Sequence, residues 1–160
     1  MTTQFDSLDA IHAAALESPG ALLFTISAIA DKGTSMARIF TTHPEVYPVG
    51  GIKTFADDTN QVWIEQVIRG QQPFFGPDVQ AVRDFFFDSA TIEELGCGAI
   101  INVPVIAGGE VIGSMNFLDA DGAYGESDVA TAVDIAARSV DAVAAAYRQI
   151  LADAESRTMD

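Results

Sequence analysis

At 160 residues, the chain is long enough to bury the core of one domain, and a hydrophobic fraction of 49% excludes the intrinsically disordered class. A formal net charge of −15, with only two lysines, opposes binding to nucleic acid or to an anionic membrane. No apolar run approaches the roughly 20 residues that span a bilayer, and the N-terminus lacks a signal-peptide pattern. We therefore expect a cytoplasmic single domain over residues 1–160, with its core at 8–150 and neither nucleic acid nor membrane among its partners.

The first elements in the chain are a helix and two strands. The pattern predicts a helix over 6–18, ended by a Pro-Gly pair, and then a strand over 21–30. Apolar side chains occupy the even positions of that strand, whereas Thr25 and Ser27 lie on its other face. After a short turn, residues 35–42 predict a second, antiparallel strand.

A long irregular segment follows. Prolines and paired glycines predict a loop over 43–53, and a helix is expected at 60–68. A short edge strand at 72–75 and a helix at 78–87 come next, with another turn or two of helix at 89–95. Nine of the fourteen aromatic residues lie between positions 40 and 87. Such a segment is either a lid that encloses a small-molecule cavity or a second, minor core, and the two are compatible.

Two apolar runs around a Gly-Gly pair at 108–109 predict a β-hairpin of strands 98–107 and 110–118. Pro104 lacks a backbone N–H, so the first strand should have an incomplete neighbour on its outer side, and the second should be central.

Counting back from that turn predicts the hairpin register. Asn102 is expected opposite Met115, and Ile100 opposite Phe117. Both faces are mostly apolar, so both sides of the hairpin should be covered.

A final helix is predicted over 126–155, with apolar residues recurring at alternating steps of four and three. That stripe is longer than a sheet of this size needs, so we expect a homodimer through the terminal helices, which Val143→Glu should dissociate.

This order of elements over 8–150 resembles that of GAF domains. The segment NVPVIAGGEVIGSMNFLD at 102–119, with Tyr124 and Asp128 at the start of the last helix, carries the local resemblance. The resemblance implies an α+β fold with a central antiparallel sheet of about six strands. It further implies terminal helices on one face of the sheet and, on the other, a loop and helix lid that closes a ligand pocket.

The resemblance also suggests which hairpin face lines that pocket. It places the face of Asn102, Met115 and Phe117 at the pocket, and the face of Val103 and Ser114 under the helices. Adding the residues expected in the lid wall completes the predicted ligand-binding set: Tyr47, Lys53, Trp63, Phe75, Asn102, Met115 and Phe117.

Several chemistries of related domains lack their residues here. Cyclic-nucleotide-binding GAF domains have a lysine where Phe117 stands, so their ion pair is missing. Cys97 lies between two glycines with no basic neighbour to lower its pKa, and we expect it to be buried and inert. Bilin attachment would need a histidine beside this cysteine, and none is present there. His12 and His43 lie far apart in the sequence, and we predict neither a metal site nor a catalytic residue.

Three functions fit this sequence. The favoured one is a sensory domain that binds a small organic ligand and signals through a dimer interface or a partner protein. An enzyme similar to free methionine sulfoxide reductase, using Cys97, is the alternative. A ligand-free dimerisation module is the third. The sequence identifies neither the ligand nor a cofactor.

Overall fold

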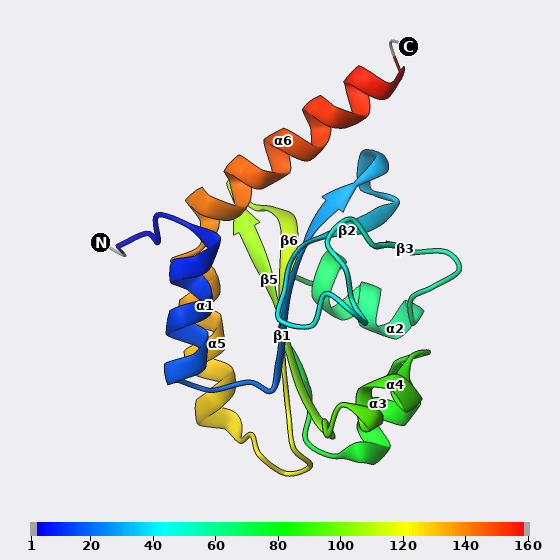
Figure 1. Ribbon diagram of the computed structural model, residues 1–160, viewed down its shortest axis with the longest axis vertical. Coiled ribbons are helices and arrows are strands. Elements are labelled where there is room, and N and C mark those ends of the chain that lie inside the picture. Colours follow the sequence, from blue (N-terminus) through cyan, green and yellow to red (C-terminus); the bar gives the residue numbers. More distant parts are fainter. Residues whose placement is uncertain (1–2, 159–160) are drawn as a thin grey trace.

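The computed structural model describes residues 3–158, and side chains as far as residue 153. Six strands form one antiparallel sheet in the order β3-β2-β1-β6-β5-β4 (Figure 1). The strands are β1 (Leu23–Ala30), β2 (Ser35–Thr41), β3 (Ile52–Thr54), β4 (Phe74–Gly76), β5 (Ala99–Ala107) and β6 (Glu110–Asp119).

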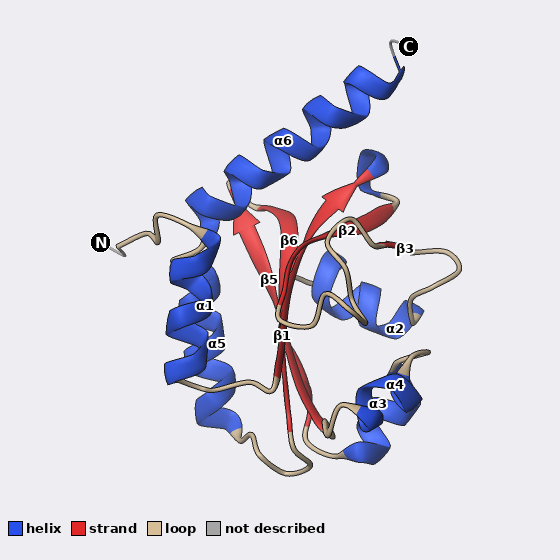
Figure 2. Ribbon diagram, in the orientation of Figure 1, coloured by secondary structure: helices blue, strands red, loops and turns tan. Residues whose placement is uncertain are grey.

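Helices cover both faces of this sheet, as Figure 2 shows. One face carries α1 (Leu8–Glu17), α5 (Glu126–Ala137) and the start of α6 (Val140–Thr158). The other face carries α2 (Gln61–Trp63), the π-helix η2 (Ile64–Arg69), α3 (Val79–Phe85) and α4 (Ser89–Glu94). The predicted α+β architecture, with terminal helices on one face and a lid on the other, is confirmed. Within the described residues, no helix is both long and apolar enough to cross a lipid bilayer.

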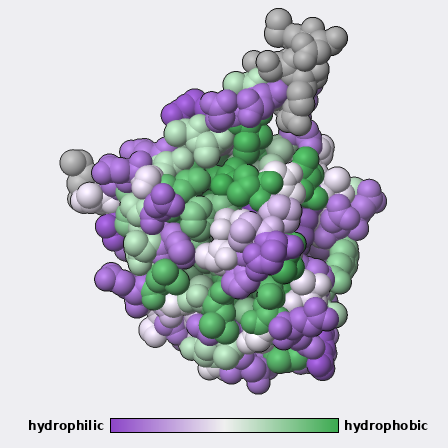
Figure 3. All heavy atoms as spheres, in the orientation of Figure 1, coloured by the Kyte–Doolittle hydropathy of each residue, from purple (hydrophilic) through white to green (hydrophobic). Residues whose placement is uncertain are grey.

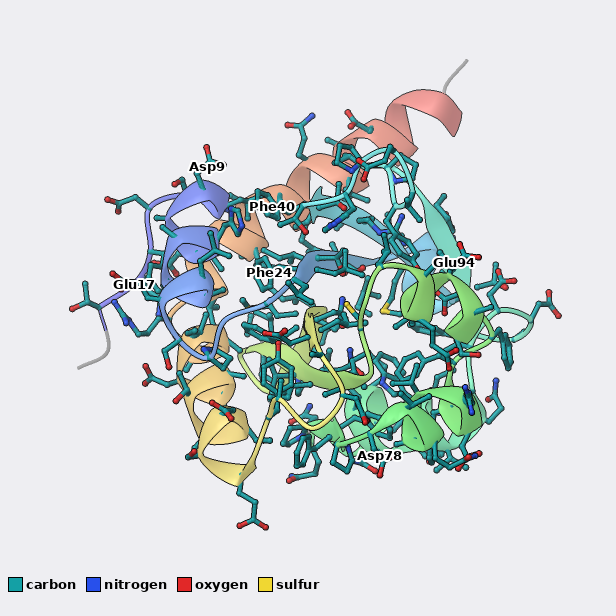
Figure 4. The ribbon with its side chains drawn as sticks, turned by 60° about the horizontal axis from the view of Figure 1, so that its bottom comes forward. Asp9, Glu17, Phe24, Phe40, Asp78 and Glu94 are labelled. Atoms are coloured by element: carbon teal, nitrogen blue, oxygen red, sulfur yellow. The ribbon has the colours of Figure 1, made fainter. Side chains whose placement is uncertain are left out.

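Each layer of helices buries its own core. Beneath α1, the ring centroids of Phe24 and Phe40 lie 5.9 Å apart, and His12 stacks on Phe24 at 5.9 Å. Figure 4 shows the two phenylalanines side by side there, while Asp9 and Glu17 of the same helix point outward. Figure 3, in the orientation of Figure 1, shows hydrophobic residues in the middle of the side turned to the viewer and more hydrophilic ones towards its edges. The predicted minor core of the aromatic segment also exists, as a second buried cluster between the lid and the sheet.

Local sequence explains where most helices start. The Ser7 side chain accepts a hydrogen bond from the Ala10 N–H at 3.1 Å and caps α1. Asn60 and Asp78 cap α2 and α3 in the same way. Such caps satisfy backbone donors that have no partner inside the helix. Strand β3 was missed because its three residues directly follow the glycine-rich part of the loop predicted at 43–53.

The register predicted for the hairpin is correct only next to the turn. Ile106 pairs with Val111 as expected, but Val105 then pairs with Gly113, which leaves Ile112 as an extra residue in β6. This β-bulge moves every later pair by one position, so Asn102 lies opposite Asn116. Because side chains alternate between faces, a slip of one residue reverses the face of the whole remaining strand. The expected pairing of Asn102 with Met115 was therefore wrong.

Pro104 behaves as its chemistry requires. Strand β4 pairs only with residues 100–102 of β5, so the proline lies beyond the end of that short edge strand. The outer neighbour of β5 is thus incomplete, as predicted, and β6 is central in the sheet.

The single long terminal helix was a wrong prediction, because the chain bends between α5 and α6. The Ser139 hydroxyl is buried and donates to the carbonyl of Ile135 at 2.6 Å, a contact that favours bending. From the bend, α6 crosses the end of the sheet and its later turns project away from it (Figure 1). The expected stripe is therefore discontinuous: Val143 is fully buried, whereas Val133 is 43% exposed.

Close packing of β1, β6 and α6 gives a test of this fold. A Cβ atom at Gly113 would lie 2.4 Å from the Ser27 carbonyl oxygen and 3.3 Å from Cγ1 of Val143. We expect Gly113→Ala to lower the free energy of unfolding by about 1–3 kcal/mol, measured by urea denaturation. Gly125→Ala is the control for the added methyl group, because no heavy atom lies within 4 Å of a Cβ there; Gly125 is the N-cap of α5, so we expect a cost below about 1 kcal/mol. An unchanged midpoint for Gly113→Ala would contradict the close approach of β1 and β6.

Candidate functional site

A cavity of about 80 Å³ lies between the lid and the side of the sheet that faces it. This volume holds several water molecules but is well below the roughly 300–1,000 Å³ of a drug-sized site. The sheet contributes a polar floor and the lid contributes aromatic walls. The floor includes Thr25, Ser27, Asn102, Ser114 and Asn116, and the aromatic wall is formed by Tyr47, Trp63, Phe85, Phe86 and Phe87.

Four of the seven predicted site residues line this cavity: Tyr47, Lys53, Trp63 and Asn102. They come from the loop before β3, from β3 itself, from α2 and from β5. The segment between β2 and β5 thus brings Tyr47 and Trp63 from the lid, and Lys53 from edge strand β3, to the same cavity as Asn102. That they bind a ligand stays a prediction.

The other three predicted residues lie on the opposite face of the sheet. Met115 and Phe117 are fully buried in the core under α1, α5 and α6, because the bulge in β6 reverses their orientation. Phe75 packs against the same core, since it pairs with Ile101 on that side. Placing these three side chains in the pocket was wrong.

A chain of hydrogen bonds crosses the cavity floor. Trp63 Nε1 donates to Asn102 Oδ1 at 3.0 Å, and Asn102 Nδ2 donates to Asn116 Oδ1 at 2.7 Å. Asn116 Nδ2 then donates to Thr25 Oγ1 at 3.0 Å, and the Ser114 hydroxyl donates to Asn116 Oδ1 at 3.3 Å. The polar partner that a buried Asn102 requires is thus supplied by protein side chains, and a cavity remains beside them.

This network holds the lid on the sheet. Asn102 is 2% exposed and Trp63 is 3% exposed, so neither side chain is open to bulk solvent. A buried donor or acceptor that loses its partner costs about 1–3 kcal/mol. The network therefore fixes α2 over β5 and sets the shape of the floor.

Charged side chains gather at one end of the cavity. The Tyr47 hydroxyl donates to Asp88 Oδ2 at 2.5 Å, and Lys53 Nζ lies 3.7 Å from Asp88 Oδ1. The Arg38 guanidinium carbon lies 4.9 Å from the centre of the Tyr47 ring, and Arg38 Nη1 donates to the Pro48 carbonyl at 3.0 Å. Two loops and two strands thus meet around one tyrosine.

Burial shapes the protonation of this cluster. Burial first, and then the hydrogen bond to Asp88, raise the pKa of Tyr47 above its ordinary value, so the phenol remains a donor. Burial lowers the pKa of Arg38, although the Asp88 charge opposes that effect. At the rim, backbone and side-chain hydrogen bonds from Thr54 lower the pKa of the exposed Asp58.

Three charged residues that line the cavity were missed from the sequence: Arg38, Asp88 and, at the rim, Asp58. Arg38 is a single charge in an apolar strand, and it pairs with Ser27 on the polar face of β1. That polar face was the available signal. Asp88 precedes α4 at the position where an aspartate usually caps a helix, but its side chain makes no capping bond and faces the cavity. No local pattern distinguishes this orientation from a cap.

Cys97 lies outside this cavity and lines a surface groove formed by residues of α3, the end of α4, residues 96–98 and Asp121. It is buried, as predicted, with 3% of its surface exposed. Burial first, and then the nearby charge of Asp119, raise the pKa of its thiol to about 11. Arg83 also lines the groove, but its guanidinium is paired with Glu93. Among the residues that the structure describes, no cluster of three or more histidine, cysteine or acidic side chains is arranged to hold a metal.

Comparisons with known proteins agree with this architecture. The family model described as "GAF domain" matches residues 6–144. No curated protein sequence matches the chain. Among solved structures, the GAF domain of a phosphoenolpyruvate-protein phosphotransferase from Coxiella burnetii is 16% identical, with a TM-score of 0.69 over 89% of this chain and 83% of that one.

Two further structures have the same fold. The second GAF domain of DevS from Mycobacterium smegmatis is 18% identical, with a TM-score of 0.58 over 92% of this chain and 94% of that one. The GAF domain of a two-component sensor histidine kinase from Bacillus halodurans is 12% identical, with a TM-score of 0.66 over 88% of this chain and 95% of that one. At these identities the likeness concerns the fold. Since the family model spans most of the sheet and both layers of helices, this chain belongs to the GAF domain family.

Proposed function

We propose that this chain is a sensory domain that binds a small organic ligand between its sheet and its lid. GAF domains are known for small-molecule sensing in signalling proteins. The observation that carries the proposal is the cavity itself, which combines a polar floor, aromatic walls and a charged end. A few placed polar groups inside an apolar enclosure are typical of small-molecule sites.

The wall residues suggest how such a ligand is held. Trp63 and its aromatic neighbours provide apolar contact, while Asn102 and the hydroxyls of the floor provide hydrogen bonds. Lys53 remains a candidate anchor, with its side chain 35% exposed at the cavity rather than turned to open solvent. Its pairing with Asp88 means that a ligand must share or replace that contact. A small ligand is favoured over a multiply phosphorylated one, because among the described residues the cations that line the wall are Arg38 and Lys53 alone.

We also propose that occupancy is passed on through the terminal helices or to a partner protein. The projecting turns of α6 are apolar in part: Leu151 is 37% exposed, and Ile150 is partly exposed beside it. A homodimer would bury these side chains. The variant first expected to test that dimer, Val143→Glu, is unsuitable, because Val143 belongs to the core of the single chain and its replacement would unfold the domain.

The reductase alternative gains no support from the position of Cys97. Its buried thiol, with a raised pKa, is a poor nucleophile at neutral pH, and it lies outside the cavity proposed for the ligand.

Filling the cavity tests the sensory proposal. We expect some members of a fragment library, containing neutral, anionic and cationic compounds, to raise the melting temperature of the wild type. Ser27→Leu should abolish these shifts, because the larger side chain would occupy the cavity. Ser127→Leu, an equal change on the exposed first turn of α5, should retain them. The proposal fails if no fragment stabilises the wild type, or if Ser27→Leu responds like the wild type.

The thiol can be tested separately. At pH 7 a pKa of about 11 leaves roughly a hundredfold less thiolate than an ordinary cysteine has. We expect labelling of native Cys97 by iodoacetamide to be at least about that much slower than labelling of the urea-unfolded chain. The rate should rise about tenfold per pH unit below pH 11. Rapid labelling of the folded protein, or methionine sulfoxide reductase turnover that Cys97→Ser removes, would support the enzyme instead.

The dimer has its own measurement. Sedimentation equilibrium at roughly tens of micromolar should show a dimer for the wild type and a shift towards monomer for Leu151→Glu. The Leu151→Glu monomer should still unfold cooperatively on heating, which shows that the domain itself stays folded. Gln149→Glu adds the same charge on an exposed position of α6 and is the control. A monomeric wild type would rule the dimer out.

A further inference from the structure

Arg38 has an incomplete set of partners at the charged end of the cavity. Its guanidinium is half-buried, lies over the Tyr47 ring and donates to one carbonyl, that of Pro48. Among the described residues, no carboxylate oxygen lies within 4.0 Å of it. A guanidinium has five N–H donors and stays charged at any physiological pH. Its unused donors suit an anionic oxygen pair, such as a carboxylate.

The Oδ1 atom of Asp88 is in an ion pair with Lys53 but lacks a hydrogen-bond donor among the described residues. Its Oδ2 atom accepts from the Tyr47 hydroxyl, but Oδ1 is buried and accepts no hydrogen bond. The nearest cation, Lys53 Nζ, is 3.7 Å away, which is too long for a hydrogen bond. A buried carboxylate oxygen without a donor is costly, so a donor from a ligand would be favoured there.

Tyr47 keeps these two groups apart. Arg38 lies over the face of its ring, Asp88 accepts from its hydroxyl, and Arg38 and Asp88 form no ion pair with each other. All three line the same cavity. A molecule that satisfies both charged groups must therefore present an anion and a hydrogen-bond donor at separate points.

We propose that the cavity binds a small amino- or hydroxy-carboxylate, with its carboxylate on Arg38 and its ammonium or hydroxyl donor on Asp88 Oδ1. This inference rests on the proposed function and narrows it to one ligand class. The cavity volume of about 80 Å³ limits such a ligand to a few heavy atoms in the present conformation. Asp88 disfavours a second anionic group at its end of the site and already pairs with Lys53, so we expect dicarboxylates and phosphorylated carboxylates to bind more weakly.

Matched acids test the two contacts by calorimetric titration. The three-carbon set is propionate, lactate, 3-hydroxypropionate, alanine and 3-aminopropionate, and the four-carbon set is butyrate, 4-hydroxybutyrate and 4-aminobutyrate. Butylamine tests the donor alone. We expect at least one amino or hydroxy acid to bind about tenfold more tightly than the plain acid of equal length, because a hydrogen bond to a charged group is worth roughly that factor. The better of the amino and hydroxy members identifies the donor.

Two near-isosteric variants assign the contacts. Arg38→Gln should weaken binding of the preferred acid by about tenfold or more, and Asp88→Asn should reduce its advantage over the plain acid. Arg69→Gln and Asp84→Asn make the same changes on exposed helical positions outside the cavity and should leave affinity unchanged. Circular dichroism melting checks that each variant folds. If Arg38→Gln does not fold, Arg38→Lys replaces it, since lysine keeps the charge but loses the planar fork.

The outcomes separate this inference from the proposed function. The ligand class is wrong if no acid in the panel binds, if plain acids bind as tightly as their amino and hydroxy analogues, or if Asp88→Asn leaves the preference intact. If neutral or cationic fragments still bind in the cavity and Ser27→Leu abolishes that binding, the sensory proposal stands although the ligand class is wrong.

Discussion

A β-bulge in strand β6 inserts one extra residue relative to β5, and the orientation of the whole site depends on this bulge. With Ile112 left unpaired beside the hairpin turn, Asn116 faces the lid and Phe117 faces the terminal helices. The same shift brings Gly113 against β1, where only a glycine fits beside the Ser27 carbonyl. Without the bulge, a phenylalanine would occupy the cavity floor and an amide would be buried among apolar helix residues, at a cost of a few kcal/mol.

Because the Asn116 amide of β6 faces the lid, hydrogen bonds connect the sheet with the lid. Asn116 bonds to β1 through Thr25 and to β5 through Asn102, and Asn102 in turn accepts from Trp63 of the lid. Each polar group in this buried chain depends on its neighbour, so we expect a change at one of them to affect the others. On the opposite face, Val143 of α6 packs beside Gly113 of the same strand. The sheet therefore offers a short physical route from the cavity to the terminal helices.

Part of the site could be predicted from sequence alone. A glycine-rich loop and an aromatic-rich lid placed Tyr47, Lys53 and Trp63 near a cavity, and the buried polar residue Asn102 marked the floor. These predictions depended on composition and on unusual residues in apolar surroundings, which are visible locally. The predictions for Phe75, Met115 and Phe117 depended on strand register, which is not visible locally. The bulge in β6 turned Met115 and Phe117 to the opposite face, and the pairing of β4 with β5 placed Phe75 there too. The sequence around Arg38 equally suits an exposed strand residue, and that around Asp88 equally suits a helix cap, so neither could be assigned to the cavity in advance.

Apart from β3 and the break between α5 and α6, the sequence by itself determined the order of helices and strands and the hairpin turn at 108–109, because hydrophobic period, capping residues and turn glycines act over a few residues. The two-faced α+β sheet followed from the resemblance of that order to GAF domains. It also determined the acidic charge and the single buried cysteine. Only the tertiary structure decided which face of β6 meets the lid, where the last helix bends, and that Arg38, Tyr47 and Asp88 share one cavity. Those features arise when segments distant in the chain pack together. Neither the extra strand residue Ile112 nor the inward orientation of Asp88 changes the periodic pattern of the sequence.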